Sequence, residues 1–143
     1  MESIYILSES VKSRLQSVVD GSGAPPIASL VGFKLISFEY GKAKFTMHAD
    51  QRHHNPGGIL HGGILCDITD AAMGVAFATT LEENQRFATI NLQINYLKAI
   101  IEDDLIAEGY LIKKGKSIGF LEAKVYDSTN NLVATASSSC KII

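Results

Sequence analysis

Residues 55–81 constrain the fold of this chain more than any other segment, and they read NPGGILHGGILCDITDAAMGVAFATTL. The first nine hold four glycines and one proline around a histidine, a composition that a packed helix does not tolerate. A long apolar run with two acids, Asp67 and Asp70, follows. We therefore predict a glycine-rich loop and then a long helix that begins near Gly62.

The start of this predicted helix is suited to binding an oxygen atom. The N–H groups of Gly62 and Gly63 would have no acceptor within the helix and would point outward from its end. The helix dipole favours an anion there, or an oxygen that gains negative charge during a reaction. Such a helix start and a carboxylate on an apolar helix are groups that acyl-transfer chemistry uses.

The whole chain has the composition of one globular domain. Of its 143 residues, 46% are hydrophobic and 20% are charged, so it can bury a moderate core. A formal net charge of −2 gives no general attraction to nucleic acid. We expect a single domain over residues 1–143, with an N-terminal helix in about residues 1–23 and the main body in residues 30–142.

The cysteines and the first residues predict a cytoplasmic protein. Two cysteines, Cys66 and Cys140, do not make a disulfide framework and fit a reducing compartment. The first ten residues, MESIYILSES, contain no basic segment, so we expect no secretory signal. The most apolar segment, residues 64–77, contains both aspartates, and we expect neither a membrane span nor a membrane partner.

Hydrophobic periodicity predicts an antiparallel sheet wrapped around the long helix. Apolar residues repeat at helical spacing over residues 7–18, and an irregular segment follows Pro25 and Pro26. Apolar and polar residues alternate most clearly over residues 89–96. The predicted strands cover residues 31–40, 42–48, 89–96, 105–113, 117–126 and 132–141. The order of one helix, two strands, a long helix and four strands indicates an α+β fold.

Six residues of this segment have a characteristic spacing. They are Asn55, Gly58, His61, Gly62, Gly63 and Asp70. Written N-x-x-G-x-x-H-G-G-x6-D, this spacing resembles the signature of the hotdog-fold thioesterases, in the branch related to the phenylacetate-pathway thioesterase PaaI and to a mammalian acyl-CoA thioesterase. The segment TINLQINYL looks like that family's strand after the helix, and Gly115-Lys116 like its next hairpin. The resemblance covers roughly residues 30–142. One departure is Lys98-Ala99-Ile100, because the family often has a proline soon after the tyrosine of that strand.

The resemblance implies a hotdog fold, in which an antiparallel sheet wraps around a long central helix, here with an extra N-terminal helix. It also implies a homodimer with a continuous sheet, commonly paired into a homotetramer, and hydrolysis of an acyl-CoA substrate. We expect no cofactor. His53, His54 and His61 raise the question of a metal, but no second cluster of cysteines or carboxylates has a suitable spacing, so we expect no metal site.

Asp70 is the first candidate for a catalytic residue. Its neighbours Ala71 and Met73 are apolar, and burial without a partner would make the carboxylate a stronger base. From the residues alone, an acid that caps the helix or pairs with a lysine is the commoner role. The resemblance implies that Asp70 activates water as a general base or attacks the thioester carbonyl as a nucleophile, and both remain open. Asp67, an acid favoured by the helix dipole, is the second candidate.

The resemblance also implies roles for residues of the loop and of the following strand. The Gly62 N–H group would polarise the thioester carbonyl with help from the Asn55 side-chain amide, and Thr89 would help to hold the attacking water. His61 and Gly63 would form part of the substrate-binding loop. Taken alone, a glycine pair or an asparagine before proline is more often part of a turn, and a strand threonine is more often solvated.

Other chemistries are less consistent with the sequence. Cys66 as a nucleophile would need a lowered pKa and a partner histidine, whereas a cysteine between apolar helix residues is usually part of the core. The chain contains no Gly-x-Ser-x-Gly elbow of the α/β-hydrolases. Lysines near the strand ends could contact the phosphates of CoA, although a solvated turn is their commoner role. These are Lys98, Lys113, Lys114 and Lys116.

Helix geometry predicts how the site is assembled. Asp70 lies eight residues beyond Gly62, so the two are about 12 Å apart along one helix, too far to contact one carbonyl carbon. The simplest solution is a twofold dimer in which Gly62 of one chain faces the partner subunit's Asp70. The resemblance implies the same shared site.

We therefore predict an acyl-CoA thioesterase that acts on a fatty or aryl acyl group, with an acyl pocket formed by the long helix and the hairpin over residues 33–47. The alternative is a hotdog module that binds acyl-CoA without hydrolysing it. Regulators of that kind usually add a DNA-binding helix pair, whereas this chain has one N-terminal helix and is not basic. A hydratase of the same fold would need a different arrangement of histidine and acid.

Overall fold

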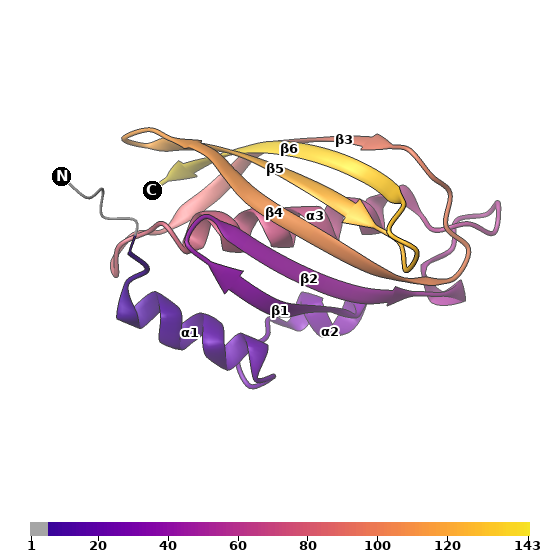
Figure 1. The fold of residues 1–143 in the computed structure, drawn as a ribbon, viewed down its shortest axis with the longest axis horizontal. Coiled ribbons are helices and arrows are strands. Elements are labelled where there is room, and N and C mark those ends of the chain that lie inside the picture. The colour runs from indigo at the N-terminus through magenta and orange to yellow at the C-terminus, as the bar shows by residue number, and fades with distance from the viewer. Residues whose placement is uncertain (1–5) are drawn as a thin grey trace.

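The long helix α3 (Gly62–Ala78) lies against one face of a six-stranded sheet that curls around it (Figure 1). The computed structural model describes residues 6–143. Residues 1–5 lie outside the described residues; they are the first part of the predicted N-terminal helix region and of the segment in which we expect no secretory signal. All neighbouring strands are antiparallel, in the order β1-β2-β4-β5-β6-β3. The strands are β1 (Phe33–Glu39), β2 (Lys42–Ala49), β3 (Phe87–Tyr96), β4 (Asp103–Lys114), β5 (Ile118–Tyr126) and β6 (Leu132–Ile142).

One face of α3 forms the centre of the core. Its buried residues recur every three or four positions, which is the period of a helix with one apolar face. They are Leu65, Ile68, Thr69, Ala72, Met73, Ala76 and Phe77. The Thr69 hydroxyl is buried but donates a 2.7 Å hydrogen bond to the carbonyl oxygen of Leu65, so its polar group is satisfied. The long helix predicted to begin near Gly62 is confirmed.

The helix approaches the middle of the sheet closely because β4 carries a glycine there. A Cβ atom on Gly109 would lie 2.4 Å from the backbone C and O atoms of Ala72 in α3. Only a residue without a side chain leaves room for helix backbone at this distance. Gly109 therefore sets how deeply α3 lies against the sheet.

Two helices cover the edge of the sheet at β1 (Figure 1). The predicted N-terminal helix is α1 (Glu9–Val19), which buries Val11 and Leu15 and is capped by the Ser8 hydroxyl oxygen, an acceptor for the Val11 N–H group at 3.3 Å. The prediction of an irregular segment after Pro25 is wrong. The chain forms the short helix α2 (Pro26–Val31) there, because proline fits the first position of a helix.

The edge strand β3 departs from the regular alternation that its sequence predicts. Its ladder with β6 contains a bulge at Ile90, and Thr89 lies opposite the buried Cys140. The extra residue shifts the alternation, so Thr89 faces α3 together with Leu92 rather than facing outward with Asn91. The predicted polar face of this strand is therefore wrong at Thr89, and the bulge brings that hydroxyl to the helix.

No helix among residues 6–143 is both long enough and apolar enough to span a membrane.

Candidate active site

The glycine-rich loop and the start of α3 are held in place through backbone hydrogen bonds. The His61 N–H group donates to the carbonyl oxygen of His53 at 2.8 Å, and the Ile64 N–H group donates to the carbonyl oxygen of His61 at 3.0 Å. Gly62 is the first residue of α3, so its N–H group has no acceptor within the helix. The His61 side chain is exposed and makes no capping hydrogen bond, so the loop depends on the backbone of His61.

A cavity of about 420 Å³ opens beside this helix start. Its walls come from the glycine-rich loop, the first turn of α3, the end of β3 and residues 97–100, and they are mostly apolar. The lining residues are Asn55, Ile59, Leu60, Gly62, Leu65, Tyr96, Leu97, Lys98, Ala99 and Ile100. A cavity of this size and character is typical of small-molecule sites.

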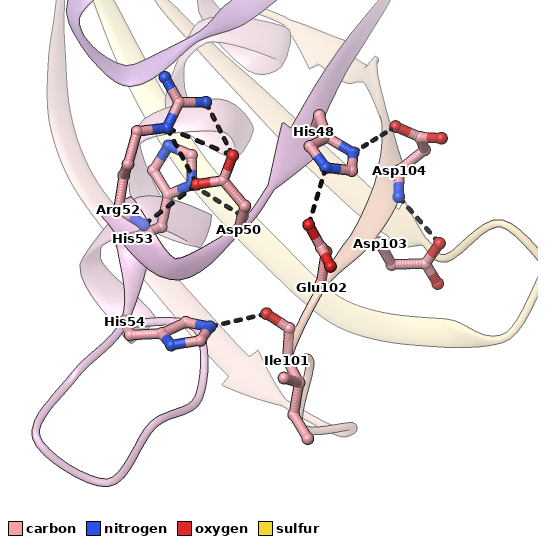
Figure 2. A network of polar contacts seen from close by, with 9 residues as sticks. All are labelled: His48, Asp50, Arg52, His53, His54, Ile101, Glu102, Asp103 and Asp104. Carbon is pink, nitrogen blue, oxygen red and sulfur yellow. Dashed lines mark hydrogen bonds and ion pairs between the residues drawn. The ribbon is translucent and has the colours of Figure 1, made fainter.

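Two hydrogen bonds tie the walls of the cavity together. The Leu60 N–H group donates to the carbonyl oxygen of Ile100 at 2.7 Å, and the His54 Nε2 atom donates to the carbonyl oxygen of Ile101 at 2.7 Å. Figure 2 shows His54 reaching across from the loop to Ile101. These bonds couple the glycine-rich loop to the connection between β3 and β4.

Asn55 is a turn residue that also borders the cavity. Its Oδ1 atom accepts hydrogen bonds from the N–H groups of Gly57 at 2.9 Å and Ile59 at 3.3 Å, which orders the loop. The oxygen is thereby engaged, and among residues 6–143 the Nδ2 group has no hydrogen-bond partner. Asn55 and Gly62 line the same cavity.

Tyr96 covers the start of α3, a contact that the sequence analysis missed. Its Cζ and Oη atoms lie 2.7 Å from the position that a Cβ atom on Gly62 would occupy. The Tyr96 Oη atom is also 3.5 Å from the Cys66 Sγ atom on the next turn of the helix. The hydrogen bond to Cys66 and then burial raise the pKa of Tyr96 to about 12. No sequence signal beyond the alternation of the strand points to this role.

Asp70 lies farther along α3 and is joined to Thr89. The Thr89 hydroxyl donates a 3.2 Å hydrogen bond to the Asp70 carboxylate, so two residues predicted from the sequence meet in space. The expectation that Asp70 is buried within an apolar face is wrong for the single chain, because Asp70 is exposed on the side of α3 that faces away from the core. The carboxylate is therefore available to water and to a ligand.

The surroundings of this pair are partly apolar. The Thr89 hydroxyl also lies 3.9 Å from the Sγ atom of Cys140, and burial raises the pKa of that buried thiol.

Asp67, one turn before Asp70, is half-buried. Burial, followed by the charge of Asp70, raises the pKa of Asp67, while His61 acts in the opposite direction. Two carboxyl groups thus lie on the same outward side of α3.

The structure does not bring all the predicted residues together within one chain. Gly62 and Asn55 border the cavity, whereas Asp70 and Thr89 do not. Since Gly62 and Asp70 are eight residues apart in one helix, about 12 Å of helix separates them. The two halves of the predicted site are therefore both formed, but at different points along α3.

Within the single chain, several side chains of the hairpin of residues 33–47, which was predicted to line an acyl pocket, pack into the core. Phe33, Phe45 and Met47 are buried, and the two phenylalanine rings pack edge to face with centroids 5.7 Å apart. These side chains fill the core instead of lining a cavity. A larger depression of about 1090 Å³ lies over β1, β2 and β4. Its lining includes residues 37–44 of the hairpin and Lys113 and Lys114, but none of the residues predicted to be catalytic.

The histidines of this region have structural partners. His53 is buried; its Nε2–H group donates to the carbonyl oxygen of Val31 at 2.7 Å, and its Nδ1 atom accepts from the N–H group of Asp50 at 3.1 Å. His54 bonds to Ile101, as described above. Among residues 6–143, no three His, Cys, Asp or Glu side chains are grouped so that they could hold a metal ion.

His48 belongs to an exposed cluster of acids at the end of β2 (Figure 2). Its Nδ1 atom is 2.8 Å from Asp104, and its Nε2 atom is 3.4 Å from Glu102. The hydrogen bonds to Asp104 and then to Glu102 raise the pKa of His48. This cluster lies beside the connection between β3 and β4, outside the cavity lining.

Lys98 takes part in a contact that the sequence analysis did not foresee. It lies in the cavity wall and pairs with the Asp127 carboxylate, which is buried in the turn between β5 and β6. Asp127 also accepts from the N–H groups of Thr129 at 3.0 Å and Asn131 at 2.8 Å. The hydrogen bond from Lys98, together with those from the turn, holds the pKa of Asp127 well below its usual range. Lys98 therefore has a partner in the protein.

Comparison with known proteins adds independent information. Residues 57–134 match the thioesterase superfamily. The 1,4-dihydroxy-2-naphthoyl-CoA hydrolase of Listeria monocytogenes is 28% identical over 103 residues, which cover 72% of this chain and 84% of that protein. Human acyl-coenzyme A thioesterase 13 is 26% identical over 102 residues, which cover 70% of this chain and 72% of that protein.

The fold has close counterparts among solved structures. The E. coli PaaI protein from the phenylacetic acid degradation operon superposes with a TM-score of 0.83, covering 96% of each chain at 21% identity. An antiparallel sheet wrapped around a long helix is the hotdog fold, and the fold class predicted from the sequence is confirmed.

Because the superfamily match covers more than half of the residues, the chain belongs to the thioesterase superfamily. It is a thioester hydrolase of the hotdog fold, as its sequence predicts.

Proposed function

We propose that this protein hydrolyses an acyl-CoA thioester with a fatty or aryl acyl group to the free acid and CoA. The observation that carries the proposal is that α3 presents the free N–H end at Gly62 to a largely apolar cavity and, farther along, the Asp70 carboxylate bonded to Thr89. Relatives named as a naphthoyl-CoA hydrolase and an acyl-coenzyme A thioesterase support the choice of substrate class.

In the proposed reaction the thioester carbonyl oxygen is bound by the N–H group of Gly62. Negative charge develops on this oxygen as the carbonyl is attacked, and the positive end of α3 stabilises it. The Nδ2 group of Asn55, which borders the same cavity, donates toward the substrate. His61 and Gly63 hold the shape of the loop around it.

Asp70 assists the attack on the carbonyl carbon. It removes a proton from water as a general base or attacks the carbon directly as a nucleophile, and the geometry is compatible with both. The Thr89 hydroxyl orients the carboxylate through its 3.2 Å hydrogen bond and, in the first case, also helps to place the water. In the first case the water oxygen bonds to the carbonyl carbon, the C–S bond breaks, and the proton held by Asp70 passes to the CoA thiolate. In the second case the CoA thiolate leaves as an anhydride forms between Asp70 and the acyl group, and water then hydrolyses this anhydride to the free acid and the Asp70 carboxylate.

We further propose that the site is shared in a homodimer, which pairs into a homotetramer. Each carbonyl would be bound by Gly62 of one subunit and approached by the partner subunit's Asp70. The separation of these residues along α3 supports this arrangement, because one chain does not place both beside one carbon. The exposure of Asp70 in the single chain is consistent with a partner subunit covering it.

A thiol-release assay over short, long and aromatic acyl-CoA substrates tests the proposed function. We expect wild-type protein to release CoA, and we expect Asp70→Asn to lower kcat by about 10²–10⁴-fold, the contribution of a general acid or base. Circular dichroism checks that the variant remains folded. Asp67→Asn is the matched substitution one turn away and should have a much smaller effect.

Two results would contradict the proposal. Wild-type protein that binds acyl-CoA but releases no thiol from any member of the panel would indicate a binding module. Loss of turnover in Asp67→Asn with retention in Asp70→Asn would assign the catalytic role to the other acid.

A further inference from the structure

We propose that the Tyr96 hydroxyl is a second hydrogen-bond donor to the thioester carbonyl oxygen held at Gly62. This inference rests on the proposed function, and it assigns a catalytic role to a residue outside the motif of the glycine-rich loop. It begins from the position of the phenol at the free end of α3.

The phenol lies directly over the first residue of the helix. The Cζ and Oη atoms of Tyr96 are both 2.7 Å from the position of a Cβ atom built on Gly62. The hydroxyl is therefore close to the residue whose N–H group points out of the helix end. A side chain at position 62 would collide with the ring. Glycine at this position therefore both exposes its amide and leaves room for Tyr96.

The strand geometry keeps the phenol in this position. Tyr96 is the last residue of β3, lies opposite the buried Ala134 of β6 and therefore points to the side of the sheet that carries α3. Tyr96 borders the cavity and 53% of the residue is exposed, so we expect a ligand in the cavity to reach the hydroxyl.

The hydrogen bond between the Tyr96 hydroxyl and its partner is weak, so the hydroxyl can leave that partner for a stronger acceptor. Among the described residues, the hydroxyl contacts the Cys66 Sγ atom at 3.5 Å, and a thiol is a weak donor and a weak acceptor. A carbonyl oxygen that gains negative charge is a much stronger acceptor. Turning the hydroxyl from Cys66 toward such an oxygen would therefore cost little.

The hydroxyl also keeps its proton under working conditions. The hydrogen bond to Cys66 and burial raise the pKa of Tyr96 to about 12. The phenol is consequently a neutral donor throughout the neutral and moderately alkaline range. A donor of this kind stabilises an oxyanion without being consumed in the reaction.

The test separates the hydroxyl from the ring. Tyr96→Phe keeps the ring over Gly62 and removes only the donor. We expect kcat for acyl-CoA hydrolysis to fall about 10²-fold, as when one oxyanion donor is removed, with KM nearly unchanged. Tyr96→Leu, which also removes the ring from the cavity wall, should lower kcat to the same degree and raise KM.

Cys66→Ala is the matched control. It removes the contact between Cys66 and Tyr96 but leaves the hydroxyl, so kcat should stay near the wild-type value. If the contact with Cys66 were only structural, Cys66→Ala and Tyr96→Phe would lower kcat equally, and that result would overturn the inference.

The remaining outcomes separate the inference from the proposed function. Wild-type kcat in folded Tyr96→Phe, with Asp70→Asn inactive, would reject the role of Tyr96 alone. A wild-type protein without turnover on the whole panel would reject both.

Discussion

The two acids on the outward side of α3 differ in their surroundings. Asp70 is exposed and accepts a hydrogen bond from Thr89. Asp67 is half-buried, and no hydrogen bond to its side chain is formed among the described residues. Burial and the charge of Asp70 both disfavour the charged form of Asp67, and His61 opposes them. A residue in this state costs stability when it ionises.

We therefore predict that Asp67→Asn stabilises the protein, and that the gain in melting temperature grows from pH 4 to pH 8. The pKa of Asp67 in the folded state is raised above its ordinary value. Between the pKa of Asp67 in the unfolded state and its higher pKa in the folded state, the folded state binds more protons than the unfolded state. Stability therefore falls as pH rises through this interval. Asparagine does not ionise, so the variant does not lose stability in this way as pH rises.

Thermal melts across the pH range measure this effect. A melting temperature for Asp67→Asn that is displaced equally at pH 4 and pH 8 would show that charge is not the cause.

At the level of elements, the contact between α3 and β4 depends on the absence of a side chain at position 109. The backbone of Ala72 occupies the space that a Cβ atom would need, so α3 or β4 would have to shift to admit one. Overpacking of a core is costly when the obstructing atoms belong to the backbone.

Gly109→Ala should therefore lower the free energy of unfolding by about 1–3 kcal/mol or more. Gly74→Ala provides the matched control within α3, because a Cβ atom there would be 3.5 Å from the Phe87 ring, an ordinary contact. That substitution should stabilise the helix by up to about 1 kcal/mol. Urea denaturation measures both variants, and a Gly109→Ala protein as stable as wild type would show that α3 can shift.

At the level of the whole molecule, the spacing along α3 separates the two groups of the proposed site within one chain. The cavity is bordered by Gly62, Asn55 and Tyr96, whereas Asp70 and Thr89 lie outside its lining. A twofold axis would bring the second group of one subunit to the first group of the other.

Complementation between subunits tests this arrangement. Gly62→Val should block the helix end by meeting Tyr96, and Asp70→Asn should remove the carboxylate. Each homodimer should be inactive, but a purified heterodimer would contain one intact site and should show about half of the wild-type activity. Verified heterodimers as inactive as both parents would place each site within one chain.

Much of the fold could be predicted from local patterns. The helical spacing in residues 62–78 and the alternation of apolar residues in the strands reflect burial on one face, and a single sequence displays both. The helix α2 was missed, because Pro25 and Pro26 also fit a loop and the helix is very short. Local turn and stop signals were enough to predict where the first helix ends and that a hairpin turn lies at Gly115.

The candidate site was predictable to a lesser degree. The glycine-rich loop and Asp70 could be selected from motif spacing, and Thr89 from the family resemblance of its strand, but the distances between these residues could not be predicted. Thr89 reaches Asp70 because β3 has a bulge at Ile90, and a bulge depends on pairing with β6 rather than on the strand's own residues. The predicted acyl pocket stays a prediction, and the sequence did not show that Phe33, Phe45 and Met47 of the hairpin belong to the core.

The sequence by itself determined where α3 begins and which residues are candidates for the chemistry, because these properties depend on neighbours within a few positions. Only the tertiary structure decided that Tyr96 covers Gly62, that Lys98 pairs with Asp127 and that Asp70 is exposed on the outward side of α3. These contacts join segments far apart in the chain. Strand register and the close approach of helix and sheet set them, and neither is encoded in any single stretch of residues.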